Sequence, residues 1–415
     1  MPIVAEIIAV GTELLLGNVA NTDAQEISQG LSELGIHVYY HTTVGDNDAR
    51  LRAAVDIARA RADILITTGG LGPTYDDMTK QTMAGCFGLK LVRDERSWER
   101  IRAYFANVGH AVTPNNERQA WLPEGCTVME NQWGTAPGCI FSAAGKHVLM
   151  LPGPPRECTA MFRHCAMPWL RTLTSGTLVS RNIHIFGMGE SAVENVLRDL
   201  METAENPTVA PYAKEGEVML RVTARADTEE QARRLTEPAV RDICEKLGDV
   251  VYGIDAGSLE QRVSVLLRER GLTLASAESC TGGLLGARLT ELSGASEVFA
   301  GGVVAYAEAA KIRLLSVPDE TLRTQGAVSG PVAEAMARGV RERFGADIGV
   351  GITGLAGPDG DGSGTPVGVV FVSLCAEETC VVRQYALGAG RRRIRVSAVN
   401  RALDMVRRYL LDLPM

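Results

Sequence analysis

Apolar runs alternate with amphipathic segments along the first part of the chain. The runs at 3–10, 62–68 and 146–151 each end in a loop rich in glycine or proline, and segments 23–34 and 48–60 have helical periodicity. Short apolar strands that alternate with helices predict a parallel α/β sheet. Ligands bind beyond the carboxyl ends of the strands in such a sheet, and we expect the three loops to converge there.

Two further blocks follow along the chain. Residues 172–253 have the order strand, helix, strand, strand, helix, strand, which predicts a small α+β domain. Ser258 and Gln261 then form a capping box that starts a third block, in which strands and helices alternate again. We therefore expect an α/β protein of three domains: 1–171, 172–253 and 254–415, the last an αβ layered domain.

Composition narrows the class of protein. Hydrophobic residues make up 46% of the chain, and the net charge is −8. No run approaches the roughly 18 apolar residues of a membrane helix, and residues 1–6 are strand-like without a basic n-region, so we expect neither a membrane span nor a signal peptide. The acidic balance argues against a general nucleic-acid binder, which usually has a basic face. We expect a cytoplasmic protein.

The nine cysteines fit no C-x-x-C pattern for zinc or redox chemistry. An odd number of scattered cysteines is typical of reduced cytosolic thiols. A secreted disulfide framework is not expected.

The turn at 277–283 is the first candidate for catalysis. It lies between an apolar strand and a helix, which would expose Ser279 and direct free backbone N–H groups at a ligand. Gly282 and Gly283 would allow the substrate to approach closely, Thr281 is a further candidate for substrate binding, and helix N-terminal amides would form an oxyanion hole. The alternative is an ordinary strand–helix turn with a Ser/Thr cap.

The available bases in the third block are few. All six histidines lie within the first 184 residues, and Lys311 is the only lysine after Lys246. A desolvated lysine with a depressed pKa can activate a serine, whereas arginine stays protonated. Lys311 follows Tyr306, at the end of an apolar strand expected over 301–306, where burial is plausible. The alternative is an ordinary surface lysine.

Two more segments of this block offer ligand contacts. The glycine-rich loop at 351–360 contains Thr353 and Gly354, and the basic run at 391–395 contains Arg391 and Arg395, which could bind a phosphate. The alternatives are a long turn and a solvated helix face.

The loops of the first block are typical of phosphate binding. Backbone amides of such loops cradle phosphates; the candidate residues are Gly11, Thr12, Gly69, Gly70, Gly72 and Gly153. Asp76 and Asp77 could hold a divalent cation that bridges the phosphates. The alternatives are a helix N-cap for the two aspartates and a rigid turn for residues 152–155.

Several segments of the third block together resemble a known family. Segments 276–283, 302–311, 326–329, 352–358 and 366–368 are similar to the CinA carboxy-terminal domain, which includes PncC-type nicotinamide mononucleotide amidohydrolases. The resemblance implies hydrolysis of nicotinamide mononucleotide (NMN) to nicotinate mononucleotide and ammonia, without a cofactor. It also implies that Ser279 is the nucleophile, activated by Lys311 with Tyr306, and that Thr353, Arg391 and Arg395 face the nucleotide.

The chain departs from the family pattern in two places. Ala307-Glu308-Ala309 stands where the family usually has Ser-Asn-Glu, and Gly330 stands where it usually has Glu. Both departures leave the Ser279–Lys311 pair intact.

The rest of the chain extends the resemblance to its full length. Segments 11–22, 68–77, 114–120, 131–138 and 151–157 resemble the CinA amino-terminal domain, which is similar to molybdopterin-binding proteins of the MoaB/MogA type; the middle block resembles the CinA KH-like domain. The resemblance implies a metal-dependent ADP-ribose pyrophosphatase, a homodimer and a role in pyridine-nucleotide recycling. The middle block lacks a clear G-x-x-G loop in a basic setting, so RNA binding is not inferred.

Two rival functions stay open from the sequence. The first block could hold a pterin or a nucleotide without turnover. The protein could instead serve as an interaction protein in competence or the response to DNA damage.

Overall fold

The computed structural model describes residues 3–174, 176–214, 216–362, 364–388 and 390–415. Residues 1 and 2 of the segment expected to be strand-like lie outside this set. The described chain clusters into two compact units, Met1–Val179 with Arg225–Arg233, and Ser180–Ala224 with Arg234–Met415. Among the described residues, no helix is both long enough and apolar enough to cross a membrane.

The first unit contains a six-stranded sheet in the order β2-β1-β3-β8-β7-β6. The first four of these strands are parallel, as the sequence predicts, and β7 and β6 add an antiparallel edge. The strands are β1 (Val4–Val10), β2 (His37–Val44), β3 (Ile64–Thr68), β6 (Thr127–Met129), β7 (Gly138–Ala143) and β8 (Lys146–Leu151), with a separate pair β4 (Leu91–Arg93) and β5 (Trp121–Pro123).

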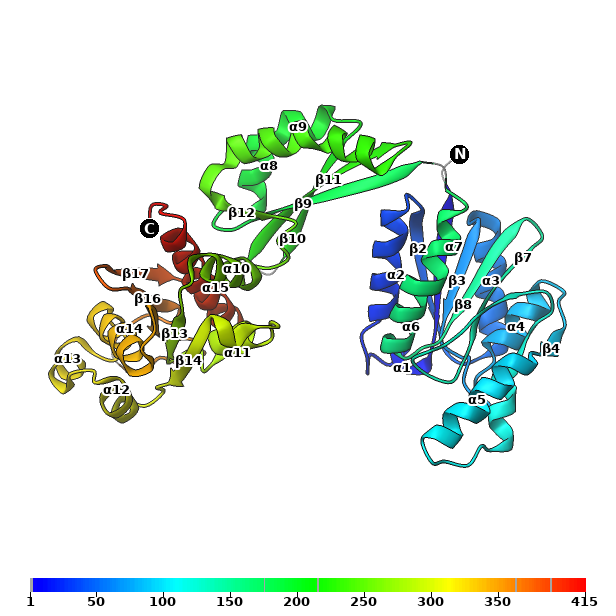
Figure 1. The fold of residues 1–415 in the computed structure, drawn as a ribbon, viewed down its shortest axis with the longest axis horizontal. Coiled ribbons are helices and arrows are strands. Elements are labelled where there is room, and N and C mark those ends of the chain that lie inside the picture. The colour runs from blue at the N-terminus through cyan, green and yellow to red at the C-terminus, as the bar shows by residue number, and fades with distance from the viewer. Residues whose placement is uncertain (1–2, 175, 215, 363, 389) are drawn as a thin grey trace. The chain divides into compact units, whose positions relative to one another are not determined.

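Helices cover both faces of this sheet (Figure 1). One buried cluster joins the sheet to α2 (Thr22–Glu33), α6 (Pro155–Met161) and α7 (Met167–Arg171), and the other joins it to α3 (Asp48–Arg61) and α4 (Thr79–Cys86). The remaining helices are α1 (Thr12–Leu15), α5 (Glu95–Asn107), a 3₁₀ segment at Pro114–Ala120 and a π-helical turn at Phe162–Ala166. Apolar side chains are thus buried on both faces, as parallel strands require.

The middle block forms a four-stranded sheet in the order β10-β11-β9-β12. Its elements are β9 (Thr177–Ile185), α8 (Glu190–Thr203), β10 (Thr208–Lys214), β11 (Glu217–Ala226), α9 (Glu229–Leu247) and β12 (Val251–Ile254), with a short 3₁₀ turn at Gly248–Val250. Residues of α8 and α9 share one buried cluster with the strands. This is the α+β order predicted from the sequence.

The last block contains a five-stranded sheet in the order β14-β13-β15-β16-β17. β13 (Leu274–Glu278), β14 (Phe299–Val304) and β15 (Ile348–Gly354) are parallel, and β16 (Val369–Cys375) and β17 (Cys380–Ala386) are antiparallel.

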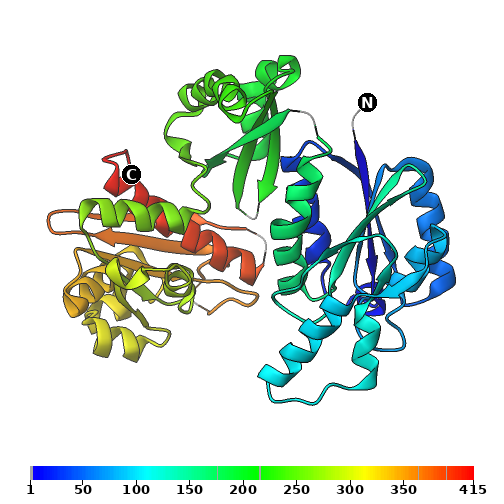
Figure 2. The same ribbon diagram turned by 45° about the vertical axis from the view of Figure 1, so that its right-hand side comes forward.

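Two layers of helices enclose this sheet (Figure 2). One layer consists of α10 (Leu259–Arg270), α11 (Leu284–Thr290) and α15 (Arg391–Leu410); the other consists of α12 (Glu308–Leu315), α13 (Asp319–Gln325) and α14 (Gly330–Phe344). A 3₁₀ turn at Ala295–Glu297 precedes β14.

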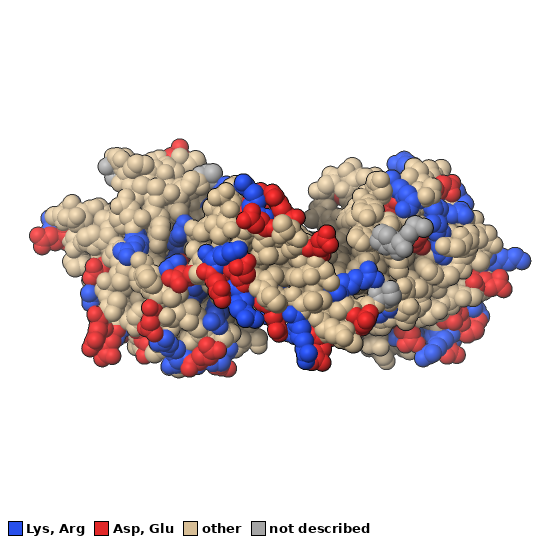
Figure 3. Space-filling model, turned by 90° about the horizontal axis from the view of Figure 1, so that it is seen from above, with Lys and Arg blue, Asp and Glu red and all other residues tan. Residues whose placement is uncertain are grey.

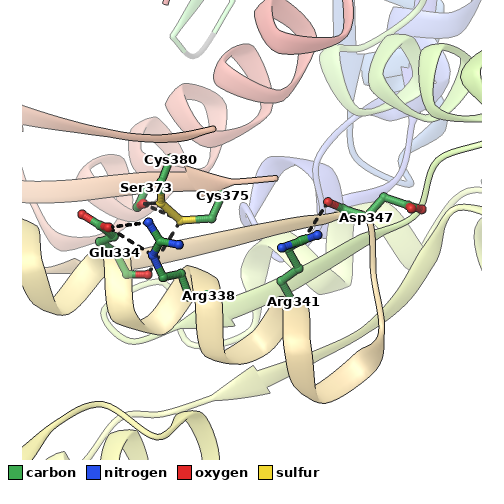
Figure 4. Close-up of a disulfide and its surroundings, with 7 residues drawn as sticks. All are labelled: Glu334, Arg338, Arg341, Asp347, Ser373, Cys375 and Cys380. Atoms are coloured by element: carbon green, nitrogen blue, oxygen red, sulfur yellow. Dashed lines mark hydrogen bonds and ion pairs between the residues drawn. A yellow bond between two sulfur atoms is a disulfide. The ribbon is translucent and has the colours of Figure 1, made fainter. Parts of the chain in front are cut away.

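The expectation that all nine cysteines are reduced is wrong for one pair. Cys375 and Cys380 form a disulfide, with Cα atoms 4.2 Å apart. They lie directly opposite each other in the antiparallel β16–β17 pair, near Ser373 and the main-chain carbonyl of Glu334 in α14 (Figure 4). Strand register, rather than a C-x-x-C spacing, brings them together.

Candidate functional sites

Ser279 and Lys311 meet at the carboxyl end of β13. Ser279 follows the strand directly, and its backbone N–H donates to the carbonyl of Ile352 in β15 at 2.9 Å. Nζ of Lys311 lies 3.1 Å from Oγ of Ser279. Both side chains are buried, with 8% of Ser279 and 2% of Lys311 exposed.

The position of Lys311 in the fold corrects the prediction from sequence. The apolar strand is Phe299–Val304, and Lys311 belongs to the helix α12 rather than to the end of a strand. One turn into α12, its side chain reaches back to donate to the carbonyls of Ala305 at 2.9 Å and Tyr306 at 3.4 Å. The side chain of Lys311 therefore extends back across the junction between β14 and α12, which brings its amine to Ser279.

Burial dominates the electrostatics of this amine. It lowers the pKa of Lys311, while the charge of the Glu308 carboxylate opposes the shift. In the described structure its hydrogen-bond partners are neutral, two carbonyls and a hydroxyl. Burial without a hydrogen-bonded carboxylate therefore shifts the amine toward the uncharged form, which is the form that can accept a proton.

The backbone after Ser279 supplies unused donors. In the part of the chain that the structure describes, the N–H groups of Thr281 and Gly283 make no hydrogen bond to another backbone group. Gly282 and Gly283 have φ values of 60° and 88°, which a tight left-handed turn needs and which other residues rarely adopt. The turn therefore presents amides beside the Ser279 hydroxyl.

These donors differ from the helix N-terminal amides expected from the sequence. The N–H groups of Leu285 and Gly286, in the first turn of α11, donate to the carboxylate of Glu278 at 3.0 and 2.9 Å. Glu278 is 2% exposed and was not singled out from the sequence. An acid one residue before Ser279, at the end of an apolar strand, was the available signal.

The other predicted residues of this site surround the pair at differing distances. Arg395 donates to the carbonyl of Thr281 at 2.7 Å and so braces the turn. Arg391 donates to the phenol oxygen of Tyr306 at 3.1 Å and to the carbonyl of Gly357 at 2.6 Å. Tyr306 thus contacts Lys311 through its main-chain carbonyl, while the residue as a whole is 61% exposed. An activating role for its phenol stays a prediction.

Thr353 and Gly354, which the sequence placed in a glycine-rich loop, are the last two residues of β15. The hydroxyl of Thr353 donates to the carbonyl of Ala327 at 2.7 Å, and the side chain is 1% exposed. A Cβ on Gly354 would lie 2.7 Å from the side chain of Val370. Both residues hold β15 in place in this structure, and their contact with a nucleotide stays a prediction.

The three loops of the first unit converge as expected and enclose a cavity of about 630 Å³. Gly11, Gly69, Gly70, Gly72 and Gly153 all line it. A Cβ on Gly69, where φ is 87°, would lie 2.2 Å from the carbonyl oxygen of Val10, so this approach requires glycine. Thr12 is not among the lining residues, because its N–H and hydroxyl bind the carboxylate of Asp46 at 2.9 and 2.8 Å.

Carboxylates dominate the charge of this cavity. The acidic residues that line it are Glu13, Asp23, Asp46, Asp76, Asp77 and Glu157, and no lysine or arginine is among its described lining residues. Asp23, on α2, is 7% exposed, its Oδ1 has no hydrogen-bond partner among the described residues, and burial raises its pKa to about 6. The sequence analysis did not identify Asp23.

Asp76 and Asp77 both line the cavity, but the carboxylate of Asp77 already accepts hydrogen bonds from residues of its own loop. The Asp77 carboxylate accepts from the N–H groups of Gly72 and Thr74, each at 2.8 Å, and from the Thr74 hydroxyl. Among the described residues no group of three or more His, Cys, Asp or Glu side chains is arranged to hold a metal ion. The lining still consists of the oxygen donors that hard divalent cations prefer.

Comparisons with known proteins cover the whole chain. Residues 6–172 match the probable molybdopterin binding domain, residues 180–253 the damage-inducible protein CinA KH domain, and residues 256–410 the CinA C-terminal domain.

Curated relatives match over nearly their full length. A "CinA-like protein" of Dictyoglomus thermophilum is 48% identical over 98% of this chain and 99% of its own. A "Putative competence-damage inducible protein" of Acetivibrio thermocellus is 47% identical over 99% of both. Among solved structures, "the protein CinA with unknown function" from Thermoplasma acidophilum is 36% identical, covering 41% of this chain and 98% of its own, with a TM-score of 0.38. On the full-length identity to these curated relatives, the chain belongs to the CinA family.

Proposed function

We propose that the chain deamidates NMN to nicotinate mononucleotide and ammonia at Ser279. The observation that carries this proposal is the 3.1 Å contact between the buried Lys311 amine and the Ser279 hydroxyl. We assign the base to lysine because the last block contains no histidine and Lys311 contacts the Ser279 hydroxyl. The identity of the substrate rests on the resemblance of the motifs around this pair to PncC-type amidohydrolases.

The reaction begins with transfer of the Ser279 proton. A neutral Lys311 amine donates its two hydrogens to the carbonyls of Ala305 and Tyr306, and its lone pair accepts the hydroxyl proton as Oγ attacks the carboxamide carbon. The developing oxyanion is stabilised by the amides of the 280–283 turn.

The protonated Lys311 then completes the first half of the reaction. It returns its proton to the amide nitrogen, so that ammonia leaves and the nicotinoyl group stays on Oγ as an ester. Water attacks this ester, with Lys311 again accepting a proton, and nicotinate mononucleotide leaves as Ser279 recovers its hydrogen. Both C–N cleavage and ester hydrolysis therefore balance without a cofactor.

Ammonia release from NMN by the purified full chain tests this proposal. Ser279→Ala should be inactive, while Ser264→Ala, which changes another buried serine, in α10, should remain active. An unmodified chain that releases no ammonia from NMN, or an active Ser279→Ala variant, would refute it.

We propose a second activity in the first unit, the divalent-metal-dependent hydrolysis of ADP-ribose to AMP and ribose 5-phosphate. The observation that carries it is the cavity in which glycine loops present backbone amides among carboxylates. An anionic diphosphate cannot bind six acidic side chains without a cation between them, and Asp76 and Asp77 are the residues we expect to hold it. When bound, the cation would neutralise charge on the diphosphate and on its leaving group.

Two rival functions predict other results. If the cavity only binds a pterin or a nucleotide, no AMP will form from ADP-ribose with any divalent cation. If the chain acts by direct contact with DNA, binding should survive physiological salt, whereas a nonspecific charge effect is lost with modest salt. Acidic and basic residues are interspersed on the face drawn in Figure 3, which is not the basic stripe that nucleic-acid binders show.

A further inference from the structure

A cavity of about 350 Å³ lies inside the second unit, between α8 and α15. The loop at 186–190 and residues 216–218 line it from the middle block, and Leu387 and one face of α15 line it from the last block. Phe186 belongs to the same buried cluster as residues of α15, so a shared core holds the two walls together. None of the described lining residues of this α8–α15 cavity also lines the acidic cavity of the first unit or bonds to the Lys311 amine.

The loop that enters α8 has unused main-chain donors beside this cavity. In the described chain, the N–H groups of residues 187–191 make no hydrogen bond to another backbone group. Gly189 is the N-cap of α8, a helix of 14 residues, and no side chain caps this helix end. A Cβ on Gly189 would meet nothing within 4 Å, so the space in front of the amides is open. Free amides at a helix N-terminus attract anions.

One face of α15 supplies positive charge to the same cavity. Four of its side chains line the cavity at the three- and four-residue spacing of adjacent helical turns: Arg393, Ser397, Asn400 and Arg401. Arg393 has neither an ion pair nor a hydrogen bond with another described side chain. Arg401 lies over the rings of Phe186 and Tyr385, 5.0 and 5.2 Å from their centres, and pairs with no described carboxylate. Two guanidinium groups are therefore available to an anion.

A buried amide on this face is an independent indication of a ligand. Asn400 is 1% exposed, and its Oδ1 accepts from the guanidinium of Arg288. A guanidinium can only donate, so this bond fixes the orientation of the amide. Nδ2 of Asn400 donates to no described residue, and a Cβ on Gly216, another lining residue, would lie 3.1 Å from it. A buried donor without a partner is destabilising, and an anion in the cavity can accept from it.

The acidic residues of the lining leave these donors free. The carboxylate of Glu217 accepts from the phenol of Tyr252 at 2.8 Å, and Glu190 is exposed to solvent. Guanidinium groups and main-chain amides together match the several acceptor oxygens of a phosphate. The volume of the cavity is at the lower end of the range for small-molecule sites, about 300–1,000 Å³. Apolar residues form the rest of the wall, and an organic group can pack on them: Phe186, Met188, Val218 and Leu387.

We propose that the α8–α15 cavity binds the phosphate monoester of a small organic molecule. The phosphate accepts from Arg393, from Nδ2 of Asn400 and from the amides that lead into α8, and the organic group lies against the apolar wall. Arg391 and Arg395, beside the Ser279 site, are each two residues from Arg393, which is about half a turn around the helix. The cavity is therefore a second site on the other side of α15, not an extension of the deamidase site.

Equilibrium binding of glycerol 3-phosphate to the full chain, with a chelator present, tests this site. Arg393→Gln should weaken binding by about tenfold or more, because it removes a charge-assisted hydrogen bond to the phosphate. Arg392→Gln removes the same charge from an exposed neighbour that does not line the cavity, and it should leave binding unchanged. Glycerol, which lacks the phosphate, should not bind.

Gly189→Asp tests the helix end without weakening the fold. Aspartate is a preferred N-cap residue and the space for its Cβ is open, so the midpoint of urea denaturation should not fall. Its carboxylate would bond to the amides and repel the phosphate, so glycerol 3-phosphate binding should be lost, whereas Gly189→Ala should retain it.

Three outcomes would overturn the assignment. The first is a wild-type chain that does not bind glycerol 3-phosphate, or that binds inorganic phosphate alone. The second is binding that neither Arg393→Gln nor Gly189→Asp weakens. The third is a single-stranded oligonucleotide that binds through Arg393 when glycerol 3-phosphate does not, because the ligand would then be a nucleic-acid backbone.

Discussion

At the residue scale, Lys311 is the proposed base, and Lys311→Arg distinguishes a base from a residue that supplies only a positive charge. Arginine keeps the charge and most of the length but cannot accept a proton. We expect kcat for NMN to fall by about 10²-fold or more, with a small change in KM. Arg313→Lys, an exposed change on the same helix, should have no effect on ammonia release. A variant with near-normal kcat and a raised KM would mean that Lys311 binds phosphate instead.

The same residue sets the expected pH dependence. Only the neutral amine accepts the Ser279 proton, and burial lowers the pKa of Lys311, so the neutral fraction at a given pH is larger than for an exposed lysine. The value of kcat/KM should rise with pH and reach a plateau below the ordinary lysine value of about 10.4. Initial rates between about pH 7 and 10 test this. A rate that still climbs in proportion to hydroxide at the top of this range would contradict it.

At the scale of elements, hydrophobic periodicity predicted most strands and the loops after them, because both depend on local sequence. It placed Ser279 at the end of β13 and brought the glycine loops to one sheet edge. It did not predict α5. One face of this helix lines a cavity and carries polar residues, so its pattern differs from that of a helix packed against a core. Nor did it predict the Cys375–Cys380 disulfide, which depends on strand register. The buried Oε1 of Gln119, which has no hydrogen-bond partner among the described residues, depends on tertiary packing and was not predicted either.

The α11 helix depends on Glu278, and Glu278→Gln tests that dependence. The carboxylate accepts from the N–H groups of both Leu285 and Gly286, whereas a glutamine has one acceptor oxygen for the two. We expect the free energy of unfolding to fall by about 1–2 kcal/mol, the usual cost of losing such a cap. Urea denaturation measures it, with Glu297→Gln, an exposed ion-pair residue, as control. An unchanged midpoint would show that Glu278 does not stabilise the helix.

On the scale of the whole molecule, the two proposed sites lie in different compact units and should fail independently. Asp77→Asn removes a charge and one acceptor from the glycine loop of the acidic cavity. We expect ADP-ribose cleavage to be lost, by about 10²-fold or more, and NMN deamidation to stay at the wild-type rate. Asp56→Asn, an exposed change on α3, is the control. Equal loss of both activities would indicate a folding defect or a shared site.

Deamidation should also survive truncation, at a cost in stability that depends on where the chain is cut. Phe186 and Tyr252 belong to the same buried cluster as residues of α10 and α15, and the buried Arg407 donates to the carbonyl of Asp249 at 2.9 Å. A fragment of residues 254–415 loses these partners, whereas residues 180–415 keep them. We expect both fragments to release ammonia from NMN in the presence of a chelator, and the shorter one to unfold at least about 5 °C lower, since each lost aromatic contributes several kcal/mol. Thermal unfolding beside the ammonia assay measures both effects. A folded short fragment without activity, or complete inhibition by the chelator, would contradict a metal-free Ser279–Lys311 site confined to the last block.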